Sequence, residues 1–133
     1  MSGTTHRPIT SERLRTPPGP WSNAIEVRPN ARYLYTCGLV GVRQDGTMEE
    51  GVAAQTVRIF ENIQILLHEA GMDMNDVVKI ISYLVDVADQ PAYAKARNPY
   101  LGTARPAMTL LGIAQLSHPT LRIEVEMIAA KHD

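Results

Sequence analysis

The spacing of hydrophobic and polar positions changes along the chain between strand-like and helix-like patterns. Residues 33–42, YLYTCGLVGV, are aromatic and β-branched, as is typical of a strand, and an Asp-Gly pair at 45–46 favours a tight turn after them. Residues 77–85, VVKIISYLV, are too short for a long helix and dense in β-branched residues, which predicts a central strand buried on both faces. Two further strands are expected at 107–113 and 121–129.

Two helices are expected between these strands. From residue 52 to residue 70, positions on one face recur at steps of four and three, namely Thr56, Phe60, Ile63, Leu67 and Ala70. Gly71 supplies a stop after this helix. A second, shorter helix begins at Asp89, which can cap it, and has Pro91 in its first turn, whereas Pro99 and Gly102 end it.

The order of these elements predicts an α+β domain in which two helices cover one face of a mixed sheet. The last strand alternates, so Ile123 and Val125 point to one face while Glu124 and Glu126 point to the other. A sheet covered on one side leaves its other face in need of a partner, which makes an oligomer plausible. We expect a single domain over residues 1–133, with an irregular, proline-rich segment at residues 1–17.

Composition narrows the classes of function. The chain has 133 residues, a net charge of −1 and no basic run, which argues against a nucleic-acid partner. Its single cysteine, Cys37, cannot form an intramolecular disulfide, and no apolar run reaches the roughly 18 residues of a membrane span. We therefore expect a soluble, cytoplasmic protein with no membrane partner. Because the phosphate-loop, dinucleotide and zinc-site motifs are absent from the sequence, we expect no cofactor and no metal.

A few residues are candidates for chemistry, and each has a plain structural alternative. Glu124 and Glu126 on one strand face could orient a water molecule, or form a solvated edge. Cys37 is either an activated thiol or a small buried core residue. Gly38 marks a bulge or lets a ligand approach the backbone, and Trp21 is a packing anchor or the wall of a ligand site.

Several segments in order resemble the RidA family, also called the YjgF/YER057c/UK114 family, and the resemblance covers nearly everything from Pro17 onward. The segments are PGPWSNAI at 18–25, YTCGLVG at 35–41, EAG at 69–71, DVVK at 76–79, YLVDVAD at 83–89, RPAM at 105–108 and IEVEMIA at 123–129. The resemblance implies a chorismate-mutase-like fold and a homotrimer with small-molecule clefts between adjacent subunits. It also implies hydrolysis of reactive enamines and imines, such as 2-aminoacrylate, to 2-keto acids and ammonia.

The resemblance also implies site residues, and here the chain departs from the family. Glu124 matches the glutamate that positions water, and Gly38 matches the glycine of the cleft. The family's substrate-binding arginine, tyrosine, serine and glutamine are replaced by Met108, Trp21, Cys37 and Leu39. Arg105 lies three residues before Met108, an odd offset that places it on the opposite strand face unless Pro106 breaks the alternation.

These departures shape the expected function. Loss of the arginine and the phenol makes the cleft more apolar, so we expect an imine or enamine hydrolase whose substrate is more apolar than 2-aminoacrylate or lacks its carboxylate. Glu124 would be catalytic, and the substrate wall would comprise Trp21, Cys37, Gly38, Leu39 and Met108, with Arg105 as a possible anion anchor. The alternative is a non-catalytic trimer that binds a small molecule or has a regulatory role. Ribonuclease activity is disfavoured by the balanced charge.

Overall fold

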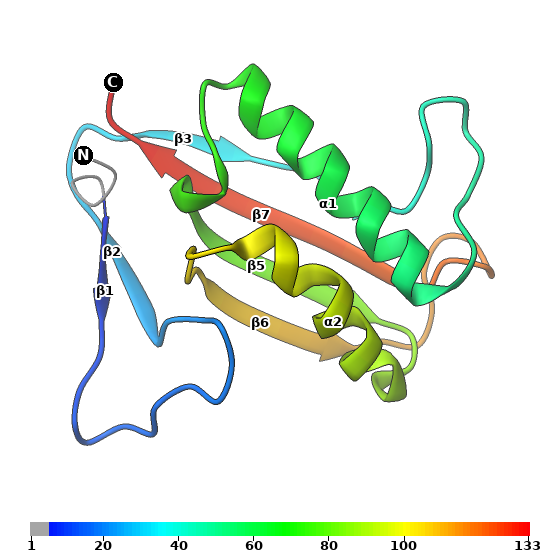
Figure 1. The fold of residues 1–133 in the computed structure, drawn as a ribbon, viewed down its shortest axis with the longest axis horizontal. Coiled ribbons are helices and arrows are strands. Elements are labelled where there is room, and N and C mark those ends of the chain that lie inside the picture. The colour runs from blue at the N-terminus through cyan, green and yellow to red at the C-terminus, as the bar shows by residue number, and fades with distance from the viewer. Residues whose placement is uncertain (1–5) are drawn as a thin grey trace.

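A mixed five-stranded sheet with helices on one face organises residues 6–133, the part of the chain that the computed structural model describes. Figure 1 shows the two helices side by side in front of the sheet and a two-stranded ribbon at one end. The elements are β1 (His6–Ile9), β2 (Ala24–Val27), β3 (Arg32–Tyr35), β4 (Leu39–Val40), α1 (Gly51–Glu69), β5 (Val77–Leu84), α2 (Gln90–Leu101), β6 (Ala107–Gly112) and β7 (Ile123–Lys131), with short 3-10 turns at Met74–Asp76 and Val87–Asp89.

The strand order in the main sheet is β3-β7-β5-β6, and β4 also pairs with β7. Strands β5 and β6 are parallel, whereas β7 is antiparallel to β3, β4 and β5. The prediction of an α+β domain with two helices on a mixed sheet is confirmed. β5 is an inner strand as predicted, but from Val78 onward only alternate residues are buried, because the helices cover one face of the sheet and the other face is open in a single chain.

The hydrophobic core lies between the sheet and the helices. In β7, Ile123, Val125 and Met127 are buried while Glu124 and Glu126 are only half-buried, which confirms the predicted alternation. The helix α1 contributes the face predicted from its periodicity, including Phe60 and Ile63. Burial of such apolar surface against the sheet holds the helices in place.

The ends of the helices follow the sequence signals with two exceptions, both in α2. Gly71 follows Ala70, the C-cap residue of α1, and adopts a positive φ of 69°, a conformation that favours glycine. Asp89 occupies the N-cap position of α2, but its carboxylate accepts hydrogen bonds from Arg122 rather than from the helix backbone. Pro99 does not end α2, since it lies in the last turn, and the helix continues to Leu101 before Gly102.

The strand predicted over residues 33–42 is interrupted by a bulge. Tyr35 is opposite Ile128 and Leu39 is opposite Val125, so four steps on this strand match three on β7. The Met127 amide donates a hydrogen bond to the hydroxyl of Thr36, so a side-chain oxygen is the acceptor where a regular strand would offer a backbone carbonyl. The extra residue lets the chain bend and start the short strand β4.

The N-terminal segment is more ordered than its prolines suggested. β1 pairs antiparallel with β2, with His6 opposite Val27 and Ile9 opposite Ala24, so the prediction of an irregular segment at residues 1–17 is wrong for His6–Ile9. Pro8 is tolerated because a two-stranded ribbon consists of edge strands. Residues 1–5, which the same prediction included, lie outside the described residues.

Candidate functional site

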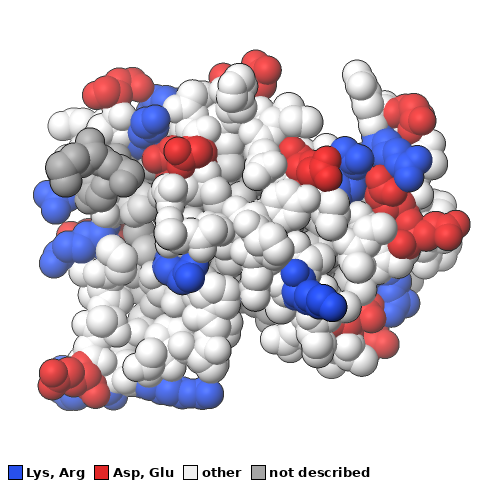
Figure 2. Space-filling model, in the orientation of Figure 1, with Lys and Arg blue, Asp and Glu red and all other residues white. Residues whose placement is uncertain are grey.

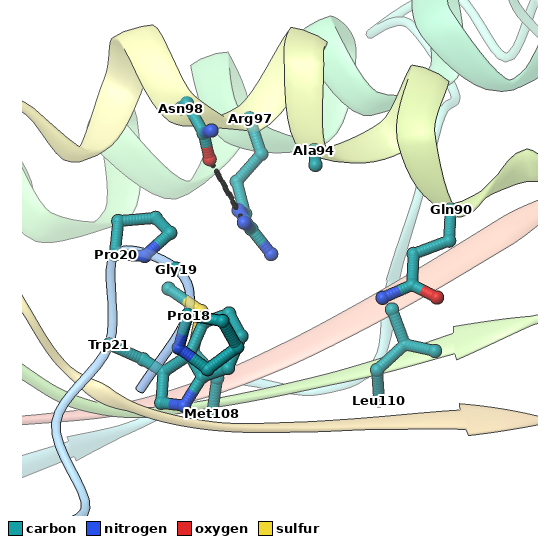
Figure 3. Close-up of a pocket in the computed structure, with 10 residues that line it drawn as sticks. All are labelled: Pro18, Gly19, Pro20, Trp21, Gln90, Ala94, Arg97, Asn98, Met108 and Leu110. Carbon is teal, nitrogen blue, oxygen red and sulfur yellow. Dashed lines mark hydrogen bonds between the residues drawn. The ribbon is translucent and has the colours of Figure 1, made fainter. Parts of the chain in front are cut away.

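A pocket of about 410 Å³ lies between α2 and the edge strand β6 (Figure 3). Met108 and Leu110 of β6 line its sheet side, the loop at 18–21 lines one end, and α2 lines the helix side. Met108 and Leu110 point toward the helices because they are paired with Ile80 and Ser82 of β5, which are buried on that face. The pocket therefore follows from the register of the parallel β5–β6 pair.

Trp21 is fixed at one end of this pocket by the loop that carries it. A Cβ on Gly19 would lie 2.1 Å from the indole ring, so only a glycine lets the ring pack on this backbone. The next residue, Ser22, donates its amide hydrogen to the Pro106 carbonyl at 3.1 Å and joins the loop to the start of β6. The indole is packed on its own loop and also faces the pocket, beside Met108 (Figure 3).

Arg97 enters the pocket from α2 and was not predicted as a site residue. It is only 7% exposed, and its guanidinium points from the helix toward Met108 and Trp21 (Figure 3). Nε and Nη2 donate hydrogen bonds to Oδ1 of Asn98 at 3.1 and 2.9 Å. The guanidinium carbon also lies 5.1 Å from the centre of the Tyr93 ring, within the range of a cation–π contact.

Tyr93 supports Arg97 from the core side. Its ring is fully buried and its hydroxyl is hydrogen-bonded to Ser82 of β5. Burial raises the pKa of Tyr93, so the phenol is neutral and supplies Arg97 with a ring face rather than a negative charge.

Glu124 lies on the opposite face of the sheet, beside Gly38. Its neighbours Ile123 and Val125 are buried under the helices, so the alternation of β7 turns Glu124 to the open face. A Cβ on Gly38 would lie 2.2 Å from Oε2 of Glu124. Gly38 thus lies in the bulged segment, and its lack of a side chain lets the Glu124 carboxylate lie against the backbone. The approach of a ligand to this backbone stays a prediction.

Tyr83 of β5 is a second residue that the sequence did not single out. It lies opposite Glu124 across the β5–β7 pair, and its hydroxyl donates a hydrogen bond to Oε1 of Glu126. This hydrogen bond, with burial and the charge of Glu124, raises the pKa of Tyr83. The tyrosine therefore remains protonated at neutral pH and holds one of the two carboxylates of this face.

The remaining candidates lie apart from both groups or at their edges. Cys37 is exposed, so its interpretation as a buried core residue is wrong, because the bulged segment carries it out of the sheet. Leu39 is partly buried against the hydrophobic core, since it is paired with the inward-facing Val125, and it does not line the Met108 pocket. Arg105 is exposed, and its Nη1 donates hydrogen bonds to the carbonyls of Gly102 and Ala104, away from the Met108 pocket.

The structure thus joins Trp21 with Met108, and Gly38 with Glu124, but it places the two pairs on opposite faces of the sheet. Within residues 6–133, no group of three or more His, Cys, Asp or Glu side chains has the arrangement of a metal site. In that same stretch of chain, no helix has the length and hydropathy needed to cross a membrane.

Fold and site define a class of protein: a small α+β domain with two helices on one sheet face, a pocket between the second helix and the sheet edge, and a glutamate on the open face. The family model described as endoribonuclease L-PSP matches residues 11–131. The chain belongs to this family, which is the RidA or YjgF family to which the sequence motifs pointed.

Relatives and solved structures support this membership. A RutC family protein from Pyrococcus abyssi is 34% identical, over 92% of this chain and 95% of its own length. The mouse 2-iminobutanoate/2-iminopropanoate deaminase is 28% identical, over 98% of this chain and 96% of the deaminase. The crystal structure of a Rid-family protein of unknown function from Yersinia pestis superimposes with a TM-score of 0.86 at 28% identity, over 96% of this chain and 99% of that chain.

Proposed function

We propose that this protein hydrolyses the C=N bond of a reactive imine, or of the enamine that tautomerises to it, in a cleft formed by two subunits of a homotrimer. The contact between Gly38 and Glu124 carries this proposal, because it presents a carboxylate beside accessible backbone on an open face. Relatives from mouse and from Dermatophagoides farinae are named 2-iminobutanoate/2-iminopropanoate deaminases, which gives the chemistry a precedent at 28% and 27% identity.

Glu124 would act as the general base in this reaction. Its carboxylate takes a proton from a water molecule while the water oxygen bonds to the imine carbon and the C=N electron pair moves to nitrogen. The nitrogen takes up the proton that Glu124 holds, which gives a carbinolamine. The hydroxyl proton of the carbinolamine then passes to the nitrogen as the C–N bond breaks, and ammonia leaves as the carbonyl forms. One imine and one water thus give one ketone and one ammonia.

The separation of the two residue pairs is the reason for proposing a cleft between subunits. In one chain, Glu124 is on the open face, whereas Trp21 and Met108 are on the helix side at the sheet edge. The open face also exposes Tyr33 and Tyr35, which are 49% and 68% exposed. Burial of these rings against a second copy would favour assembly and bring Glu124 of one subunit toward the pocket of another.

The pocket side of this cleft favours an apolar substrate body. Trp21, Met108 and Leu110 offer an indole, a thioether and an aliphatic surface. Met108 replaces the arginine that the family resemblance implies, so β6 itself supplies no cation. We propose that the group attached to the imine carbon is larger and more apolar than the methylene of 2-aminoacrylate.

The direct test is a coupled assay of keto-acid release. An L-amino acid oxidase produces imines from leucine or phenylalanine, and a pyridoxal-phosphate dehydratase produces 2-aminoacrylate from serine. We expect wild type to accelerate keto-acid release, most strongly from the apolar imines, and Glu124→Gln to abolish the acceleration. Glu26→Gln, the same change on the distant ribbon strand β2, is the matched control and should behave as wild type. Undiminished turnover by Glu124→Gln excludes the mechanism.

A non-catalytic binding trimer is the second candidate, favoured by the fact that one chain completes the pocket without Glu124. Keto acids that raise the melting temperature but emerge unchanged, with no acceleration of any imine, would favour this function. Ribonuclease activity is not part of the proposal, because positive and negative side chains are interspersed on the helix-bearing face, without a basic stripe (Figure 2). Intact RNA after incubation with the purified protein is the expected result.

A further inference from the structure

Arg97 is a buried cation without an anionic partner. Its residue exposure is 7%, and none of the ion pairs formed within residues 6–133 includes it. Among the described residues its guanidinium contacts neutral groups, namely the Asn98 amide oxygen and the ring and hydroxyl of Tyr93. A charge removed from water in this way is unfavourable unless a counter-charge compensates it.

The guanidinium also has unused donors. A guanidinium carries five N–H groups, and the bonds to Asn98 use Nε and Nη2. These bonds and the contact with Tyr93 leave several N–H groups of the guanidinium over, and the side chain lines the pocket (Figure 3). The Asn98 bonds and the Tyr93 contact hold the planar guanidinium in one orientation. Its remaining N–H groups are therefore preorganised to donate hydrogen bonds to a planar carboxylate.

We propose that Arg97 binds the carboxylate of the substrate, and that the substrates are 2-imino acids with a large apolar side chain. The carboxylate would lie against α2 and the side chain against Trp21 and Met108. The cation that β6 lacks at Met108 is then supplied from across the pocket by the helix. The sequence allowed two kinds of substrate, one more apolar than 2-aminoacrylate and one without its carboxylate. Binding of a carboxylate by Arg97 favours the first. It rests on the proposed function for the fate of the bound molecule.

The pocket dimensions agree with this class. About 410 Å³ falls within the range of cavities that hold a small organic ligand, which runs from roughly 300 to 1,000 Å³. An aromatic or branched side chain would fill space that the methylene of 2-aminoacrylate leaves empty. The indole of Trp21 would stack on such a group.

The test measures binding apart from turnover. Phenylpyruvate, the product of hydrolysing the phenylalanine imine, is titrated into the full protein by calorimetry, and phenylacetone serves as the neutral probe without the carboxylate. We expect wild type to prefer phenylpyruvate, and Arg97→Met to weaken its binding by about 10- to 150-fold with little change for phenylacetone. Lys95→Met removes a charge from an exposed position of the same helix and should leave both affinities unchanged.

Two further variants address folding and rival anchors. Met108→Arg in the Arg97→Met background supplies a cation from the strand side of the same pocket and should restore part of the preference for the carboxylate. Such rescue also shows that the Arg97→Met protein is folded. If Arg105→Met rather than Arg97→Met weakens phenylpyruvate binding, the anchor lies beyond the C-terminal end of α2 and the assignment is wrong.

The outcomes separate this inference from the proposed function. Glu124→Gln should retain the affinity for phenylpyruvate while losing turnover. If Glu124→Gln turns over normally but binding depends on Arg97, the mechanism fails and the anion site stands. Equal affinity of wild type for phenylpyruvate and phenylacetone, or no binding of phenylpyruvate at all, overturns the inference.

Discussion

Replacement of Gly38 by alanine tests the contact on which the proposed chemistry depends. The added Cβ would lie 2.2 Å from Oε2 and 2.7 Å from Cδ of Glu124. Ordinary van der Waals contact begins at 3.4 Å, so the carboxylate has to move by about 1 Å or more. Gly38 is not among the glycines with positive φ, so an alanine backbone is accommodated there without strain.

The two consequences differ in size. A displacement of about 1 Å in a catalytic group costs on the order of 100-fold in rate. Stability should change by less than about 1 kcal/mol, because the atom that moves is the end of a flexible side chain on an open face. We therefore expect Gly38→Ala to lower kcat/KM for the leucine-derived imine about 100-fold while the free energy of unfolding stays close to that of wild type.

Coupled keto-acid release and urea denaturation measure these two quantities. Gly46→Ala is the matched control with the opposite pattern, since Gly46 has a φ of 88° and no atom near its Cβ position. It should lose about 1 kcal/mol of stability and keep its turnover. A second check combines Gly38→Ala with Glu124→Asp, whose shorter side chain relieves the overlap, so the two effects should not add.

The reasoning is refuted if Gly38→Ala folds as wild type and turns over at the wild-type rate. Such a result would mean that the position of the Glu124 carboxylate is irrelevant to the reaction. Loss of activity together with a large loss of stability would instead place Gly38 in the structural role of the bulge.

Two further predictions concern stability. Arg43 and Arg58 hold the pKa of Glu49 at about 2, below the ordinary value of 4.5, so the stabilisation by this carboxylate is present above pH 4.5 and is lost as the pH falls toward 2. Urea titrations at several pH values should show that the difference in the free energy of unfolding between wild type and Glu49→Gln shrinks over that interval. A constant difference contradicts the assignment. Tyr93→Phe leaves the buried Ser82 hydroxyl without its partner and should lower the free energy of unfolding by about 1–2 kcal/mol in the same assay, whereas an unchanged value would show that Ser82 finds another partner.

The sequence predicted those elements in which one face is buried along the whole element. In α1 and β7, periods of 3.6 and 2 are unbroken because every turn or pair of residues contacts the same core. The strand predicted at 33–42 does not follow this rule. Its composition is strand-like throughout, but the bulge at residues 36–38 depends on the pairing with β7, which lies about 90 residues later in the chain.

The N-terminal ribbon is the opposite case, a regular structure where the local sequence predicts an irregular one. Four prolines before residue 21 argue against regular structure, yet β1 forms because β2 offers a partner and an edge strand tolerates a missing donor. His6 also contacts the carbonyl of Asn75, which ties the ribbon to the main domain. Neither contact has a local signal in the sequence.

The candidate site was predictable where it followed a motif and not where it followed packing. Glu124 and Gly38 were identified together and are in contact, although each has a family motif of its own. Arg97 lies four residues after Tyr93, so the two share one face of α2, and no motif marks Arg97 as a site residue. The available signal was a charged residue on the same helix face as a buried aromatic residue. The charged group of such a residue must either reach solvent or line a cavity.

The division of the site between two sheet faces leads to a test of the whole arrangement. If Glu124 of one subunit serves the Arg97 pocket of its neighbour, then Glu124→Gln and Arg97→Met inactivate opposite sides of the cleft. In trimers assembled from equal amounts of the two variants, about one cleft in four combines an intact glutamate with an intact pocket. Co-refolded mixtures should therefore recover about a quarter of wild-type activity at low substrate concentration, where each variant alone is nearly inactive. Activity no greater than the mean of the separate variants would mean that one chain contains the entire site, and the open sheet face would then have another use.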